Sequence, residues 1–333
     1  MNIAVTGGAG FIGSWVAQLL LTEKRLLPPG VRDAKVAVID NLSNGLEKNI
    51  SDFSNHPRFL GLYRIDLKDG RAISELFAEF KFDICYHLAA SISVQRSIDD
   101  PRETFDNDVV ATFNLLEECR AHGTKMVYVS TCMVYAPAHN RPINEFHPTQ
   151  CASPYAAAKL AGEKLVESYH HAYGLQTVIL RPFNTYGPRQ RLDGEGGVIA
   201  KFLWQKLSGE PITVFGDGSQ TRDFTYVEDC ARFIVMAGLE SELNGFILNA
   251  GTGRDVPIRK LAEIIAADKV EIRFVPHPHP QSEKQRLVCD YSLAKNMLGW
   301  RPSVELEQGL ALTESWLIEN FADIREGMSG TVS

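Results

Sequence analysis

Residues 6–13 read TGGAGFIG, and this stretch decides the fold. It follows an apolar run, Asn2–Thr6, that predicts a β-strand, and it leads into helical periodicity over Phe11–Leu21. Glycines between a strand and a helix allow a tight turn, a close backbone approach to a pyrophosphate, and close helix–strand packing. The pyrophosphate then rests on free N–H groups at the positive helix end. A purely structural glycine turn is the alternative. The predicted cofactor-binding residues here are Gly7, Gly10, Phe11, Ile12 and Gly13.

The chain after this turn alternates short apolar runs with segments of helical periodicity. Near-continuous apolarity is typical of strands that helices cover on both faces. We therefore expect an α/β fold with a doubly wound parallel sheet of the Rossmann type. The predicted strands are Lys35–Asp40, Phe59–Arg64, Ile84–Leu88, Met126–Ser130 and Gln176–Leu180, and the predicted helices are Arg71–Phe80, Thr104–Ala121 and Pro154–Tyr173.

The pattern changes after Pro182, where short strands, glycine-rich turns and helices are interspersed. A length of 333 residues fits about two domains at roughly 150 residues each. We expect a dinucleotide-binding domain over residues 1–180, a smaller α/β substrate-binding lobe over 181–326, and a flexible tail over 327–333. Strands predicted in the second lobe are Ile212–Val214, Phe246–Asn249 and Glu271–Phe274.

Composition excludes several classes of function. With 34 basic and 41 acidic residues the net charge is −7, which argues against nucleic acid as a partner. The six cysteines are scattered without a Cys-x-x-Cys pair, and no carboxylate–histidine cluster has ligand spacing. No apolar run approaches the roughly 18 residues of a membrane span. We expect a cytoplasmic protein with reduced thiols, no metal and no membrane contact.

The ends of the next predicted strands offer further cofactor contacts. Asp40 ends the second strand, where a carboxylate accepts hydrogen bonds from ribose hydroxyls and repels a 2′-phosphate. No arginine follows it, so the sequence favours NAD over NADP. Asp66 follows the third strand and is predicted to contact the adenine, with a turn or helix-cap aspartate as the alternative. The other predicted cofactor-binding residues are Asn41, Leu67, Leu88, Ala89 and Ala90.

Tyr155 and Lys159 indicate where chemistry takes place. Ser153-Pro154 is a natural start for a helix, and four-residue spacing puts Tyr155 and Lys159 on one helical face. A phenol with a pKa near 10 is a poor base at neutral pH, but a nearby ammonium and a positive nicotinamide ring stabilise its phenolate. Thr131, just past the fifth strand, can hydrogen-bond the same substrate hydroxyl. An ordinary surface pair on a helix is the alternative.

Six motifs together resemble the extended short-chain dehydrogenase/reductase family, and within it the NAD-dependent nucleotide-sugar epimerases and dehydratases. They are TGGAGFIG, VSTCMVY, YAAAK, LRPFNTYGPRQ, GDGSQTRDFTYVEDC and LNAGTG, in the family's order and spacing over about residues 2–315.

This resemblance implies roles for individual residues. Tyr155 takes the proton of the sugar C4 hydroxyl while the C4 hydride moves to NAD, Lys159 binds the nicotinamide ribose, and Thr131 holds the C4 oxygen. The ligand is a nucleotide-diphosphate sugar, whose charge in an acidic protein calls for local guanidinium groups. The alternative for Arg222 is an ion pair with Asp223 or Asp229. The predicted substrate-binding residues are Ser93, Asn184, Arg222 and Arg286.

The two residues after Thr131 bear on the second reaction step. The 4,6-dehydratases that the chain resembles carry an acid and a base there, whereas this chain has Cys132 and Met133. Methionine cannot abstract a proton, and cysteine is at best a moderate acid, so elimination needs a base such as His87, Glu145 or His147. A 4-epimerase needs no such pair, because the 4-keto sugar rotates and takes the hydride back on its other face.

The sequence therefore favours a 4-epimerase, with Cys132 beside the catalytic residues. A dehydratase with a variant acid/base pair, a uronic-acid decarboxylase and a non-catalytic NAD-binding protein remain alternatives. The resemblance also implies a homodimer joined by a four-helix interface. For its apolar stripe on the YAAAK helix we expect Ala158, Leu165, Val166 and Tyr169.

Overall fold

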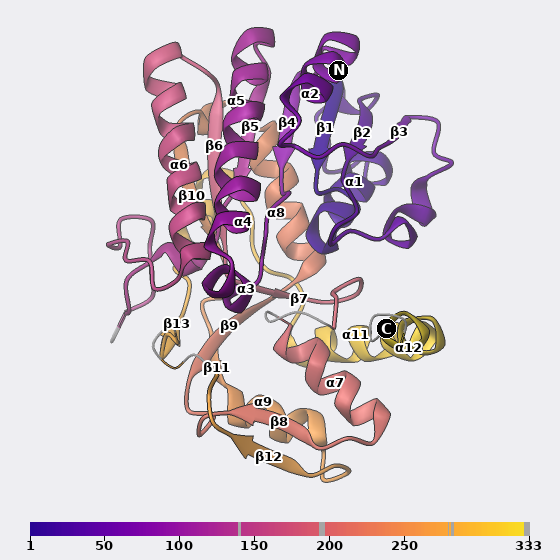
Figure 1. Ribbon diagram of the computed structural model, residues 1–333, viewed down its shortest axis with the longest axis vertical. Coiled ribbons are helices and arrows are strands. Elements are labelled where there is room, and N and C mark those ends of the chain that lie inside the picture. Colours follow the sequence, from indigo (N-terminus) through magenta and orange to yellow (C-terminus); the bar gives the residue numbers. More distant parts are fainter. Residues whose placement is uncertain (139–140, 193–196, 279, 281–282, 330–333) are drawn as a thin grey trace.

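The computed structural model describes residues 1–138, 141–192, 197–278, 280 and 283–329. A seven-stranded parallel sheet forms the larger part, in the strand order β10-β6-β5-β4-β1-β2-β3. Figure 1 shows this sheet with its helices above a smaller lobe. The predicted fold class is confirmed. The strands of the large sheet are β1 (Asn2–Thr6), β2 (Lys35–Ile39), β3 (Phe59–Tyr63), β4 (Ile84–His87), β5 (Lys125–Val129), β6 (Thr177–Pro182) and β10 (Phe246–Ala250).

Helices cover both faces of the sheet, which explains why its strands are apolar throughout. In β1, Ile3 and Val5 enter one core while Ala4 enters the other, as the alternation of a strand requires. The helices of the first core are α1 (Phe11–Thr22) and α8 (Val227–Leu239), and those of the second are α2 (Gly70–Phe80), α5 (Ala111–His122) and α6 (Pro154–Tyr173).

The chain passes between the two parts more than once. Both α8 and β10 lie beyond residue 180, yet α8 packs on α1 and β10 pairs with β6 in the large sheet. The predicted domain boundary near residue 180 therefore does not divide the chain into the two lobes. The strand predicted at Phe246–Asn249 exists, but it belongs to the large seven-stranded sheet rather than to the second lobe.

The helix predicted over Thr104–Ala121 is divided in the structure. It consists of α4 (Pro101–Phe105), one π-helical turn, η3 (Asp106–Val110), and α5. Single π-turns widen a helix locally and often accompany functional sites. The remaining short elements are η1 (Pro29–Val31), η2 (Glu47–Phe53), α3 (Val94–Asp99), η4 (Cys132–Val134), η5 (Ser241–Leu243) and α10 (Ser292–Leu298).

The smaller lobe has its own apolar core, built from three helices and a strand pair. These are α7 (Val198–Ser208), α9 (Ile258–Ala266), α11 (Leu306–Glu319), and β8 (Ile212–Phe215) with β12 (Ile272–Val275). A small sheet lies between this core and the large sheet (Figure 1). Its strands are β7 (Asn184–Tyr186), β9 (Thr221–Tyr226), β11 (Asp255–Pro257) and β13 (Arg286–Leu287).

The end of the described chain is helical. Helix α12 (Phe321–Ser329) extends into the segment expected as a tail, and residues 330–333 lie outside the described residues. In the described ranges, no helix has the length and apolar character needed to cross a membrane.

Candidate active site

In the glycine turn, backbone segments approach each other so closely that a side chain does not fit between them. Gly7 has φ +66°, and a Cβ there would lie 2.7 Å from the Ala89 nitrogen. A Cβ on Gly13 would lie 2.2 Å from the Gly7 carbonyl oxygen. Gly10 is the N-cap of α1 and brings no side chain to cover the first N–H groups, and the first turn holds no acidic residue. The turn therefore has the shape and polarity that a pyrophosphate requires.

Asp40 ties the end of β2 to this turn. Its Oδ2 accepts the Ala9 N–H at 3.0 Å, and its Oδ1 accepts the Leu42 N–H at 2.8 Å. Burial raises the pKa of Asp40, and both backbone hydrogen bonds oppose that rise. A Cβ on Gly45 would lie 2.8 Å from Oδ1, so the following loop also closes on the carboxylate.

Asp66 lies in a turn after β3. Its Oδ1 accepts the Lys68 N–H at 2.9 Å, and the Lys68 ammonium lies 3.1 Å from its Oδ2. Burial alone would raise the pKa of Asp66, but its contacts with Lys68 and Asn41 lower it. Asp66 thus has the turn role considered as the alternative. Its role toward adenine, and that of the neighbouring buried Leu67, stay predictions.

The predicted cofactor residues gather at one edge of the sheet. Strands β4, β1, β2 and β3 are neighbours, and the predicted residues follow their carboxyl ends. Ligands of doubly wound sheets bind at this edge. The small residues Ala89 and Ala90 follow β4, and Ala89 faces the glycine turn through Gly7.

Tyr155 is next to Thr131, as the sequence predicted. Helix α6 starts at Pro154, and Ser153 caps it by accepting the Ala156 N–H at 3.2 Å. The Tyr155 phenol is hydrogen-bonded to the Thr131 side chain, which follows β5. Burial raises the pKa of Tyr155, the charge of Asp108 raises it further, and the Thr131 hydrogen bond lowers it. In the protein alone the phenol is therefore neutral and needs a cation to ionise.

Lys159 lies one helical turn further along α6. Its side chain is buried, and its ammonium is 4.5 Å from the centre of the Tyr128 ring. Burial lowers the pKa of Lys159, while Asp108 and Glu163 act in the opposite direction. The site thus holds an enclosed cation on the same helical face as Tyr155.

Cys132 and Met133 begin η4, directly after Thr131. The Thr131 hydroxyl accepts the Met133 N–H at 3.2 Å. Burial raises the pKa of the Cys132 thiol to about 11, so Cys132 carries its proton near neutral pH. It can donate a proton but is poorly suited to take one.

The alternative bases are already engaged with protein groups. His87 hydrogen-bonds Thr6 through Nδ1 at 2.7 Å and Thr112 through Nε2 at 3.0 Å, and burial lowers its pKa to about 3. A Glu145 oxygen accepts the Asn249 N–H at 2.8 Å, and His147 Nε2 lies 3.1 Å from the Ala136 carbonyl oxygen.

The predicted substrate residues differ in how far protein groups already engage them. The buried Oδ1 of Asn184 has no hydrogen-bond partner in the described residues and can accept one from a ligand. Arg222 pairs with Glu283, not with Asp223 or Asp229, and donates to the Lys284 carbonyl at 2.8 Å. The Ser93 hydroxyl caps α3 by accepting the Arg96 N–H at 3.1 Å.

Arg286 points away from Arg222. In the parallel pairing of β13 with β9, Arg286 is opposite Thr221, whereas Leu287 is opposite Arg222. Residues paired in register share a face and successive residues alternate, so the two arginines lie on opposite faces. The Asp255 Oδ2 accepts from both Arg286, at 3.0 Å, and Thr221, at 2.6 Å, which fits this placement.

Two buried charged residues near the site were not predicted. Lys284 donates to the backbone carbonyls of Met133, at 2.6 Å, and Tyr135, and so supports η4. Asp108 is buried in η3. A sequence signal for Asp108 exists, because the spacing Thr104, Asp108, Leu115 puts an acidic residue on the apolar face of the predicted helix. Lys284 gives no such signal, since its contacts come from distant segments.

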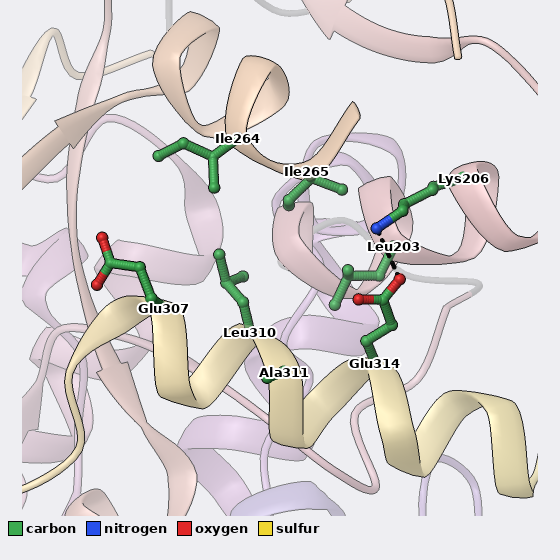
Figure 2. Close-up of a pocket in the computed structure, with 8 residues that line it drawn as sticks. All are labelled: Leu203, Lys206, Ile264, Ile265, Glu307, Leu310, Ala311 and Glu314. Atoms are coloured by element: carbon green, nitrogen blue, oxygen red, sulfur yellow. Dashed lines mark ion pairs between the residues drawn. The ribbon is translucent and has the colours of Figure 1, made fainter. Parts of the chain in front are cut away.

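A cavity of about 170 Å³ lies apart from these residues, between α7, α9 and α11. Figure 2 shows Ile264, Ile265, Leu203 and Leu310 around it, with the Lys206–Glu314 ion pair at one side. It belongs to the core of the smaller lobe. Across the residues that the structure describes, no group of three or more His, Cys, Asp or Glu side chains could hold a metal ion.

The chain is similar to known proteins over almost its whole length. Residues 4–313 match the GDP-mannose 4,6 dehydratase family. UDP-glucose 4-epimerase of Mycolicibacterium smegmatis is 38% identical over 94% of this chain and 97% of its own. The X-ray structure of Pal from Bacillus thuringiensis is 51% identical, with a TM-score of 0.92 over 96% of this chain and 99% of Pal.

A dehydratase is similar in structure as well. DesIV from Streptomyces venezuelae, a dTDP-glucose 4,6-dehydratase solved with NAD bound, is 30% identical with a TM-score of 0.88. The alignment spans 97% of this chain and 98% of DesIV. Similarity of this extent includes both the glycine turn and the helix that carries Tyr155 and Lys159.

Proposed function

The chain belongs to the extended short-chain dehydrogenase/reductase family of NAD-dependent nucleotide-sugar epimerases and dehydratases, and within it we propose that the protein is a nucleotide-sugar 4-epimerase. The observation that carries this proposal is the arrangement of Tyr155, Thr131 and Cys132. A phenol and a hydroxyl are hydrogen-bonded together, while the position beside them holds a protonated thiol rather than a carboxylate base.

NAD, when bound, accepts a hydride from the sugar and gives it back. The glycine turn would hold its pyrophosphate at the start of α1, where Gly10 leaves the first N–H groups without a side-chain cap. Asp40 is at the end of β2, where the adenosine ribose binds in this fold. Lys159 would bind the nicotinamide ribose from its buried position on α6.

The first step is proton removal from the sugar C4 hydroxyl. Tyr155 is the base, and the hydrogen bond from Thr131 stabilises its phenolate. Lys159, one helical turn away, would add its positive charge to that of the bound nicotinamide ring. Thr131 also orients the C4 oxygen. The same Tyr155 returns the proton after the keto sugar has turned over and its other face has been reduced.

The position where a dehydratase would need a base holds no proton acceptor in this chain. Met133 has no proton-accepting group, and Cys132 keeps its proton at neutral pH. His87 cannot replace them, since both its ring nitrogens are hydrogen-bonded to threonine hydroxyls. These observations support isomerisation without removal of the C5 proton.

A second candidate is a 4,6-dehydratase that uses Cys132 as its acid. The observation in its favour is the enclosed, protonated Cys132 thiol beside Tyr155, which can donate a proton to a departing C6 hydroxyl. Among the alternative bases, Glu145 is the best candidate, because burial raises its pKa. However, one of its carboxylate oxygens already accepts a hydrogen bond from the Asn249 N–H.

A substrate panel in deuterated water distinguishes the two. Purified protein is incubated with UDP-, dTDP-, GDP- and CDP-linked hexoses, N-acetylhexosamines and uronic acids, and the products are followed by NMR. A 4-epimerase returns an isomer without deuterium, because the hydride stays on the cofactor. Deuterium in a new methyl group, or loss of water from the product mass, identifies a dehydratase and contradicts the proposal.

A further inference from the structure

Asp108 is a buried carboxylate that the proposed chemistry does not use. It lies in η3, the π-turn between α4 and α5, with 1% of its surface exposed. Its Oδ1 accepts the Ser91 N–H at 2.6 Å. Its Oδ2 is enclosed and has no hydrogen-bond partner in the described part of the chain. A buried carboxylate with an unpaired oxygen is costly unless a nearby cation compensates its charge.

That cation comes from α6, which packs against η3. Lys159 is 2% exposed, so η3 and α6 each carry a buried charged residue, of opposite sign, and the two charges act on each other. Burial raises the pKa of Asp108 to about 6, and the charge of Lys159 acts against that rise. Reciprocally, burial lowers the pKa of Lys159, and the charge of Asp108 acts against that fall.

Other groups around Asp108 are compensated within the protein or neutral. Glu163 is held by Arg181 in a buried ion pair, and Asp106 pairs with Arg102 at the surface. Titratable or charged groups on the elements around Asp108 include Lys159, Tyr155 and Glu163 from α6, Tyr128 from β5, His87 from β4 and Asp106 from η3.

We propose that Asp108 is a positioning residue for the oxidation step: its carboxylate is the counter-charge of the Lys159 ammonium and controls how readily Tyr155 ionises. This rests on the proposed function in taking Tyr155 as the base, which epimerase and dehydratase share. The π-turn packs against α6, and Asp108 is its buried residue, so the widened turn carries the carboxylate at the contact between the two helical segments.

The effect of removing the charge has a defined sign. Asp108→Asn keeps an oxygen for the Ser91 N–H and removes the negative charge. Tyr155 then ionises at lower pH, because Asp108 no longer opposes the phenolate. Lys159 also loses its proton at lower pH, since its counter-charge is gone. Both limbs of the bell-shaped profile of kcat/KM should move to lower pH, by about 1 pH unit.

A direct test follows the Asp108 carboxyl by ¹³C NMR in protein with labelled aspartate. The signal is assigned by its loss in Asp108→Asn, and we expect it to titrate with a pKa of about 6. Lys159→Met should raise that pKa by about 1 pH unit or more. Arg102→Met is the matched control: it removes an exposed cation from the same helical segment and should leave the Asp108 pKa unchanged.

Two outcomes overturn the proposal. One is an Asp108 pKa that does not respond to Lys159→Met. The other is a pH profile of Asp108→Asn equal to that of the wild type, with only Asp108→Ala impaired, since this identifies a role limited to holding Ser91. If Lys159→Met does not fold, the pH profile decides alone. The NMR titration uses no substrate, so a failure of the 4-epimerase assignment leaves its result standing.

Discussion

Tyr155 is the residue on which the proposed chemistry depends most directly. Burial and the charge of Asp108 both oppose its ionisation, and these effects exceed the help from Thr131. If Tyr155 is the base, as proposed, its ionisation would need further positive charge, which the Lys159 ammonium and a bound nicotinamide ring would supply. We therefore expect the phenol to ionise more readily with NAD bound than without it.

Removing the phenol oxygen should abolish turnover without disturbing the cofactor site. Tyr155→Phe is expected to lower kcat by about 100- to 10,000-fold, the range of general acid–base catalysis, with NAD affinity little changed. Steady-state kinetics and calorimetric titration with NAD measure the two effects. Tyr173→Phe, at the exposed far end of the same helix, is the control. Near-normal turnover of Tyr155→Phe would mean that another group is the base.

The positions of Tyr155 and Thr131 could be predicted from the sequence more readily than the contacts of the residues around them. Tyr155 and Thr131 could be predicted because each lies at a fixed offset from a strong local pattern, a helix start or a strand end. The paired state of Arg222 could not, since its partner Glu283 is far away in sequence and comes close only through the β9–β13 pairing. Asp108 was not predicted, because its place on the apolar face of the helical pattern does not show that it meets α6, which packs on η3 only in the folded chain.

Among the elements, helix α1 can pack against the glycine turn only because Gly13 has no side chain. Gly13→Ala puts a Cβ 2.2 Å from the Gly7 carbonyl oxygen, so the turn must open. We expect a loss of about 1–3 kcal/mol in the free energy of unfolding, as for overpacked sites, and at least tenfold weaker NAD binding. Denaturant unfolding and NAD titration measure both. Gly30→Ala, where nothing lies within 4 Å of the new Cβ, should change neither.

The register of β13 against β9 places Arg222 and Arg286 on opposite faces, although the sequence predicted that both bind the substrate. Arg222 lies on the face of Leu287, which packs with Cys132 in the core beside the active site. Arg286 lies on the other face with Asp255. We therefore expect Arg222→Gln to raise KM for the nucleotide sugar about 10- to 100-fold, the value of a charge-assisted hydrogen bond.

Arg286→Gln is the matched substitution on the neighbouring strand. It should leave KM within about threefold of the wild type, because only its pairing with Asp255 is lost. Substrate titrations of both variants decide the matter. An equal rise in KM for both would mean that ligand binding changes the strand arrangement so that the two side chains converge.

At the scale of the molecule, the large sheet could be predicted and the links between lobes could not. Each strand of the first 180 residues lies within a residue or two of its predicted position, since apolar runs are local. That β10 returns to pair with β6 is a long-range contact with no local signature. The short strands β7, β11 and β13 carry too few residues for any periodicity.

The same scale bears on the proposed homodimer. Val166 and Tyr169, expected in its apolar stripe, instead pack in the chain's own core against α5, and Leu165 packs partly against that core. An apolar groove of about 340 Å³ lies elsewhere on α6, lined by Ala157, Ala158 and Ala161 with residues of α4 and η3. Phe105 also lines the groove and is 49% exposed, and Phe113 on α5 is 45% exposed.

We propose that a second copy of the chain covers this groove through α4, α5 and α6, which Figure 1 shows along one side of the large sheet. Phe105→Glu should then convert a dimer into a monomer, because a charge would be buried in an apolar contact. Ile318→Glu, a similar change at an exposed position of α11, should leave the dimer intact. Size-exclusion chromatography with light scattering gives the mass of each form. A wild-type monomer, or a Phe105→Glu variant that stays dimeric, contradicts the proposal.

The groove borders Val109 of η3 and Pro154 of α6, so dimer formation would hold together the two segments that carry Asp108 and Tyr155.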